Sequence, residues 1–149
     1  MAWSKRPKRT PVVLQLEAVE CAAASLGSVL AHYGRHVPLS ELREQCGVSR
    51  NGSNASNLLK AARLYGLKAK GFKKSASQLA SLSFPQIIFW EFNHYLILEG
   101  FHDGKAYLND PSCGHRTVTW EEFEESYTGL VLLLEPGETF QRGGRPHHV

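Results

Sequence analysis

The sequence predicts an α+β fold in which a helical N-terminal half packs on an antiparallel β-sheet formed by the C-terminal half. Apolar residues recur at helical spacing up to about residue 66, and strand-like runs separated by turn signals follow. The βαβ alternation that accompanies a parallel sheet is absent from the sequence. The chain has 149 residues, 42% of them hydrophobic, which suits one compact domain with a sizeable core.

Three helices are predicted in the first half. The first spans residues 22–33, where Gly34 follows as the residue that most readily takes the left-handed conformation at a helix end. The second lies within residues 38–47, with Ser40 as its expected N-cap and a glycine as its stop. After a loop, the third covers residues 55–66 and places its apolar side chains on one side.

The second half is predicted to form the sheet. Asp103-Gly104 is a strong hairpin signal, so the runs on either side of it are expected to pair antiparallel. Thr119 and Glu122 have the spacing of a capping box, which predicts a short helix before the last strand. The expected strands cover residues 67–73, 85–92, 94–101, 105–110, 116–119 and 129–136, with a short helix at 75–82.

The two ends of the chain differ in composition from the rest. The net charge is +3, and residues 4–11 (SKRPKRTP) carry four basic side chains before the first periodic segment. We expect residues 1–11 to be a flexible basic segment, either solvated or attracted to an anionic membrane surface, and residues 137–149 to be a linker or disordered tail. No nucleic-acid reading motif is present. No stretch approaches the roughly 20 apolar residues of a membrane span, so the chain as given is expected to be soluble.

Cys21 stands at the start of the first predicted helix, in a run otherwise rich in alanine, leucine and valine. The first-turn amides and the helix dipole create a positive potential there, which favours a thiolate over a thiol. The chain has only three cysteines at irregular intervals, which indicates a reducing compartment and at least one free thiol. Cys21 is therefore a candidate nucleophile, and the alternative is a small buried apolar residue.

A cysteine nucleophile needs a base, a group that orients the base, and donors for the oxyanion. His94 interrupts the most apolar part of the chain and is the candidate base, unless it is a hydrogen-bonded core histidine. Asp110 ends the strand that returns beside His94 and is the candidate orienting group, or else a turn carboxylate. Gln15 lies close enough to Cys21 in the chain to share an oxyanion hole with its backbone amide.

The register of the hairpin bears on the pairing of His94 with Asp110. A tight turn at Asp103-Gly104 places His94 opposite Cys113 and leaves Asp110 about three residues away. A longer turn or a β-bulge would bring the two side chains together.

Four short motifs of the chain occur in the same order and spacing in one known family: Gln15, Glu20-Cys21, Asn93-His94 and Asp110-Pro111. Together they resemble the cysteine peptidase domain at the N-terminus of bacteriocin-exporting ABC transporters. The similarity covers residues 12–136, and around Cys21 it is especially close to transporters that process lanthipeptide leaders. The resemblance implies a papain-like fold, a triad of Cys21, His94 and Asp110, and Gln15 in the oxyanion hole. It also implies cleavage of leader peptides after a double-glycine motif, with no cofactor.

The resemblance further implies two kinds of partner. One is a precursor peptide whose helical leader ends in a double-glycine-type motif, and the other is the transmembrane and ATP-binding domains of an exporter, at the cytoplasmic face of a bacterial membrane. The chain departs from the family pattern at Ala22, where glycine is usual, which bears on how closely substrate approaches the Cys21 amide. It also stops before any membrane span or phosphate-binding loop, so it resembles an excised peptidase domain.

Three alternative functions remain open from the sequence. Some exporters resembling these carry a degenerate peptidase-like domain that binds the leader without cutting it. A zinc site could be drawn from Cys46, Cys113 and His115, although their spacing does not match the usual ligand pairs. Another papain-like activity, such as deubiquitination or transglutamination, would share the triad.

Overall fold

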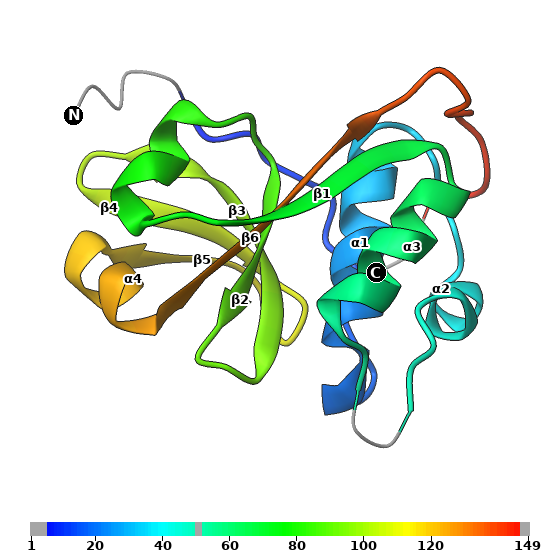
Figure 1. The fold of residues 1–149 in the computed structure, drawn as a ribbon, viewed down its shortest axis with the longest axis horizontal. Coiled ribbons are helices and arrows are strands. Elements are labelled where there is room, and N and C mark those ends of the chain that lie inside the picture. The colour runs from blue at the N-terminus through cyan, green and yellow to red at the C-terminus, as the bar shows by residue number, and fades with distance from the viewer. Residues whose placement is uncertain (1–5, 50–51, 147–149) are drawn as a thin grey trace.

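The computed structural model describes residues 6–49 and 52–146. Helices α1 (Cys21–His32), α2 (Leu39–Gln45) and α3 (Ala55–Leu64) lie on one side of a six-stranded antiparallel sheet, as Figure 1 shows. The sheet order is β1-β6-β2-β3-β4-β5, from β1 (Leu67–Lys73), β2 (Gln86–Trp90), β3 (His94–His102), β4 (Lys105–Asp110), β5 (Gly114–Thr119) and β6 (Tyr127–Pro136). Two short 3-10 helices, η1 (Ala18–Glu20) and η2 (Ala76–Ser81), and the helix α4 (Trp120–Ser126) complete the fold. The predicted α+β class is confirmed.

Two apolar clusters lie on opposite faces of the sheet. Strand residues alternate between them, so that on β2 Ile87 packs with helices α1 to α3, whereas Ile88 packs with α4 and its buried Phe123. Helix α1 is the centre of the first cluster and is buried along almost its whole length. It is rich in alanine, serine and glycine because neighbours approach closely. A Cβ at Gly27 would lie 2.9 Å from Leu42 of α2.

Most predicted elements are present, and the N-cap of the second helix is the clearest error. Helix α2 begins at Leu39 with Pro38 at the N-cap position and no side-chain cap hydrogen bond, while Ser40 lies inside the first turn. Proline has a fixed φ and no N–H, so it suits the position just before a helix. The capping box of Thr119 and Glu122 is confirmed, with Glu122 N donating to Thr119 Oγ1 at 3.2 Å.

The segments that flank the predicted domain, residues 12–136, both contact it. Lys8 N donates to the carbonyl of Glu99 at 2.9 Å, and Thr10 N donates to the Glu99 carboxylate at 2.6 Å. At the other end, the Phe140 ring packs edge-on against Tyr33, with ring centroids 6.4 Å apart. Residues 8–11 and 137–143 therefore pack on the domain, in contrast to the predicted flexible segments 1–11 and 137–149. The outermost residues of both segments lie outside the described part of the chain. Within that part, no helix is long and apolar enough to cross a membrane.

Candidate active site

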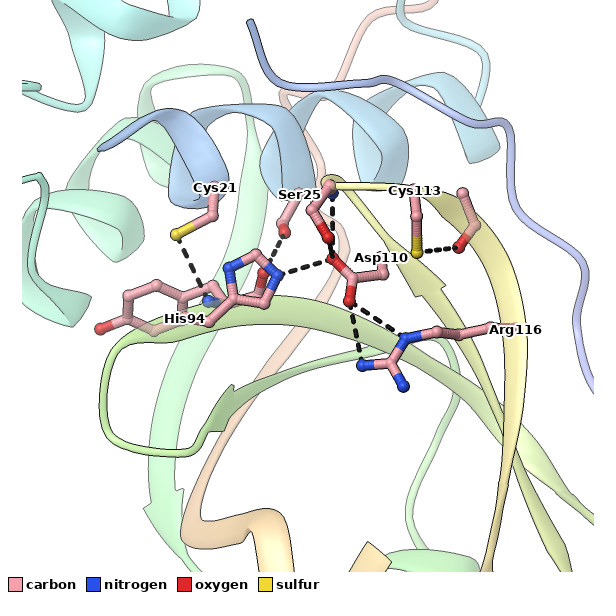
Figure 2. Close-up of polar contacts among 9 residues, drawn as sticks. Cys21, Ser25, His94, Asp110, Cys113 and Arg116 are labelled. Carbon is pink, nitrogen blue, oxygen red and sulfur yellow. Dashed lines mark hydrogen bonds and ion pairs between the residues drawn. The ribbon is translucent and has the colours of Figure 1, made fainter. Parts of the chain in front are cut away.

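Cys21 is the first residue of α1, and its side chain is almost completely buried, with 7% exposed. The loop and η1 that precede α1 bring the chain to this helix N-terminus, where the backbone amides of the first turn are unpaired within the helix. The backbone N–H of Tyr95 donates to Cys21 Sγ at 3.4 Å (Figure 2). The sulfur therefore accepts a backbone hydrogen bond from the strand that carries His94.

His94 begins β3 and lies between the sulfur and a carboxylate. Its Nε2 is 2.6 Å from Asp110 Oδ1, and its second ring nitrogen is on the side of Cys21 (Figure 2). Burial lowers the pKa of the His94 imidazolium, but hydrogen bonds and charge from Asp110 and Cys21 outweigh burial and raise the pKa to about 9. The arrangement therefore favours a protonated imidazole beside Cys21 at neutral pH.

A β-bulge helps to bring His94 and Asp110 together. The turn is the tight one, with φ of 52° at Asp103 and 73° at Gly104, and the register then shifts by one residue between Leu98 and Gly100. The sequence analysis expected either a longer turn or a β-bulge, and the structure has the β-bulge. It moves Asp110 closer to His94 along β3, where the two become diagonal neighbours that a histidine ring can span.

Asp110 accepts hydrogen bonds on both carboxylate oxygens. Ser112 donates to Oδ1 from its backbone N at 2.9 Å and from its Oγ at 2.7 Å, in addition to the contact from His94. Arg116 donates to Oδ2 from Nε at 3.2 Å and from Nη2 at 3.1 Å. Burial raises the pKa of Asp110, but hydrogen bonds from His94 and Ser112 outweigh it and hold the pKa well below its usual range. The carboxylate is therefore ionised and fixed in orientation.

Gln15 lies beside the Asp110 strand end through its backbone, because Gln15 N donates to the carbonyl of Pro111 at 2.9 Å. Its side-chain oxygen is buried without a hydrogen-bond partner among the described residues. The loop from Gln15 to Cys21 is shaped by Glu20, which is 1% exposed and whose Oε1 accepts from Leu16 N at 2.7 Å and from Glu17 N at 2.8 Å. Arg43 of α2 pairs with the other oxygen of Glu20 at 2.6 Å.

The structure thus brings Cys21, His94 and Asp110 together and places the Gln15 backbone next to them. Sequence reasoning missed the Tyr95 N–H and the side chains of Ser112 and Arg116. Arg116 could have been found from the β4–β5 turn: a turn at residues 111–113 pairs Asp110 with Gly114, so residue 116 is its diagonal neighbour.

The alternative zinc site is not assembled. Cys46 is completely buried in the helical cluster, and burial raises the pKa of its thiol to about 11, whereas His115 pairs with Glu99 on the sheet. Nowhere in residues 6–49 and 52–146 do three histidine, cysteine or acidic side chains form a group that could hold a metal ion.

Comparison with known proteins decides the family. The family model described as the peptidase C39 family matches residues 9–139. The chain belongs to this family. It is a cysteine peptidase, and its papain-like fold agrees with that of solved members of the family.

The similar proteins include peptidase domains of export systems. The chain is 30% identical to the Escherichia coli "Probable microcin-H47 secretion/processing ATP-binding protein MchF" over 94% of its own length and 20% of the relative's. It is likewise 30% identical to the Escherichia coli "Colicin V secretion/processing ATP-binding protein CvaB", over 90% and 19% of the two chains. The chain thus spans about a fifth of the length of these curated relatives.

Among solved structures, one of "a double glycine motif protease from AMS/PCAT transporter in complex with the leader peptide" is 49% identical to the chain, with a TM-score of 0.86. That match covers 89% of the present chain and 96% of the other. The peptidase domain of Streptococcus ComA is 26% identical, with a TM-score of 0.80, and the match covers 84% and 97% of the two chains.

Proposed function

We propose that the chain is the leader-peptide endopeptidase of an ABC exporter, which cleaves bacteriocin or lanthipeptide precursors after a double-glycine-type motif. The observation that carries the proposal is the alignment of Cys21, His94 and Asp110 at the N-terminus of a buried helix. The similarity to a double glycine motif protease solved with its leader peptide supports the choice of substrate.

In the first half of the proposed reaction, Cys21 is acylated by the leader. The thiolate sulfur attacks the carbonyl carbon of the last leader residue, and the carbonyl electron pair moves to oxygen. When this oxyanion collapses, the C–N bond breaks, and the amine of the released peptide takes the proton from the His94 imidazolium. The products are a Cys21 thioester of the leader and a neutral His94, which Asp110 keeps oriented through Nε2.

In the second half, water releases the leader. Neutral His94 accepts a proton from a water molecule while the water oxygen attacks the thioester carbonyl. The sulfur then leaves as the thiolate beside the re-formed imidazolium. The backbone N–H of Tyr95, which points at Cys21 Sγ, stabilises the leaving sulfur. We assign the side-chain amide N–H of Gln15 and the backbone N–H of Cys21 to the oxyanion in both halves.

An apolar groove beside the site suits the leader helix. One hollow of about 400 Å³ lies between α3 and β1 and is lined by Leu59, Phe72 and Leu130. A second one, lined by Leu130, Phe89 and the exposed Phe92, continues from it towards the β2–β3 turn that precedes His94. A helical leader would lay its apolar face along this groove and place its small C-terminal residues at Cys21.

The remaining partners follow from the relatives. Because the chain matches only about a fifth of MchF and CvaB, whose names describe secretion and processing with an ATP-binding protein, we propose that the parent protein adds transmembrane and ATP-binding domains. The peptidase would then act at the cytoplasmic face of the membrane, on precursors not yet exported.

The test is cleavage of a synthetic peptide with a helix-forming leader that ends in Gly-Gly, followed by a short tail. Wild-type protein is expected to produce one cut after the second glycine, resolved by mass spectrometry, and Cys21→Ala to produce none while still binding the peptide. The exposed Cys113 provides the matched control, and Cys113→Ser should stay within about threefold of the wild-type rate. Cleavage that persists at the wild-type rate in Cys21→Ala would refute the proposal.

A further inference from the structure

Arg116 of β5 forms a two-pronged contact with the carboxylate that orients His94. Asp110 pairs with Gly114 across β4 and β5, so Arg116 is its diagonal neighbour on the same face of the sheet. Nε and Nη2 of one guanidinium donate to the single oxygen Oδ2, at 3.2 and 3.1 Å (Figure 2). Two charged donors on one rigid guanidinium hold the oxygen that they share in place.

The donors of Asp110 are divided between its two oxygens. Oδ1 serves His94 and Ser112, whereas Oδ2 serves Arg116. The carboxylate rotates about the Asp110 Cβ–Cγ bond, so its two oxygens move together. With Oδ2 held as well, the plane of the carboxylate is fixed, and so is the direction in which Oδ1 meets His94 Nε2.

The guanidinium of Arg116 packs over the ring of Trp90. Its guanidinium carbon lies 5.8 Å from the centre of the Trp90 ring, a cation–π arrangement, and Trp90 is 3% exposed. Trp90 is also the cross-strand partner of His94 in the β2–β3 pair. The guanidinium therefore rests on the same strand pair that carries the imidazole.

We propose that Arg116 is a positioning residue for the peptidase reaction, because its fork on Asp110 Oδ2 holds Oδ1 against His94 and so keeps the imidazole aimed at Cys21. This inference rests on the proposed roles of Cys21, His94 and Asp110. Arg116 acts through Asp110, and its contribution depends on that carboxylate.

The first test compares the kinetics of Arg116→Met with wild type on the Gly-Gly peptide. Misalignment of the imidazole is expected to lower kcat about 10- to 100-fold, with KM changed by less than about threefold, because the groove is untouched. Lys105→Met removes an exposed cation from the adjacent strand and is the charge-matched control, expected to stay near the wild-type rate. A kcat of Arg116→Met within about twofold of wild type would overturn the inference.

A double-mutant cycle separates action through Asp110 from a general effect. In an Asp110→Asn background, Arg116→Met is expected to cost less than about twofold further in kcat, since the carboxylate it orients is gone. The same 10- to 100-fold loss in both backgrounds would show that Arg116 acts independently of Asp110 and contradict the proposal.

A second readout needs no substrate. The short His94 Nε2–H···Asp110 hydrogen bond should give a far-downfield imidazole proton in the NMR spectrum, absent from His94→Gln and from Asp110→Asn. It is expected to broaden or disappear in Arg116→Met and in the second variant Arg116→Gln, and to persist in Lys105→Met. Thermal unfolding identifies any variant that is not folded. An unchanged downfield proton in a folded Arg116 variant would reject the inference, whether or not the wild-type chain cleaves the peptide. Peptide left uncut by the wild-type chain would reject the proposed function alone.

Discussion

Two histidine–carboxylate pairs of nearly equal burial lie within residues 6–49 and 52–146, and they differ in that His94 of one pair lies beside the thiol of Cys21. The side chains of His94 and Asp110 are 18% and 4% exposed, and those of His115 and Glu99 are 19% and 4% exposed. The nitrogen–oxygen distances are 2.6 and 3.0 Å. Burial and pairing are therefore almost the same in the two places.

The difference lies in the third group that each pair meets. Cys21 lies beside the second ring nitrogen of His94. By contrast, His115 Nε2 is 3.1 Å from the carbonyl of Thr10, and the Glu99 carboxylate accepts from Thr10 N and Oγ1. The second pair thus fastens the N-terminal segment to the sheet. A histidine–carboxylate pair does not by itself indicate catalysis. In the proposed reaction, the adjoining nucleophile gives the His94–Asp110 pair its catalytic role.

Replacing the two histidines should separate the pairs most strongly. His94→Gln is expected to lower kcat/KM on the Gly-Gly peptide by about 10³-fold, because both proton transfers are lost. His115→Gln is expected to change kcat/KM by less than about threefold and instead to lower the free energy of unfolding by about 1 kcal/mol. Equal losses of activity in the two variants would contradict the assignment of catalysis to the His94 pair and of a structural role to the His115 pair.

Replacing the two carboxylates tests the same contrast with a smaller effect. Asp110→Asn should lower kcat by roughly 10²-fold, since the asparagine no longer stabilises the imidazolium. Glu99→Gln should leave kcat within about threefold but lower the free energy of unfolding in urea by about 1–3 kcal/mol, because Thr10 and His115 lose a charged acceptor. If Glu99→Gln unfolded like wild type, the fastening role of the second pair would be wrong.

Much of the fold and of the His94 site could be predicted from local sequence, whereas the pairing of His115 with Glu99 was not predicted. Helical spacing located α1 and α3, the Asp103-Gly104 turn located the β3–β4 hairpin, and the positions of Cys21 and His94 stood out because a polar group in an apolar run requires a partner. Chain position had already made Gln15 and Asp110 candidates, and the resemblance to a peptidase family then implied roles for all four residues.

The features that the sequence did not predict depend on contacts between distant segments. The β-bulge lies at Glu99, where Lys8 N and Thr10 N of the N-terminal segment also bond, and Thr10 is 89 positions away in the chain. The support of Asp110 by Arg116 depends on the β4–β5 register and on the Trp90 ring beneath it. Neither local propensity nor hydrophobic spacing carries such information.

The central claim is that His94 and Cys21 form one coupled acid–base pair, and the titration of His94 tests it directly. NMR of histidine-labelled protein, with the His94 signal identified by its loss in His94→Gln, is expected to give a pKa of about 9 for His94 in the wild-type chain. In Cys21→Ala the pKa of His94 should fall, because the charge and hydrogen bond of the sulfur are removed. A His94 signal that titrates near 6.5 in wild type, or that does not respond to Cys21→Ala, would contradict the account.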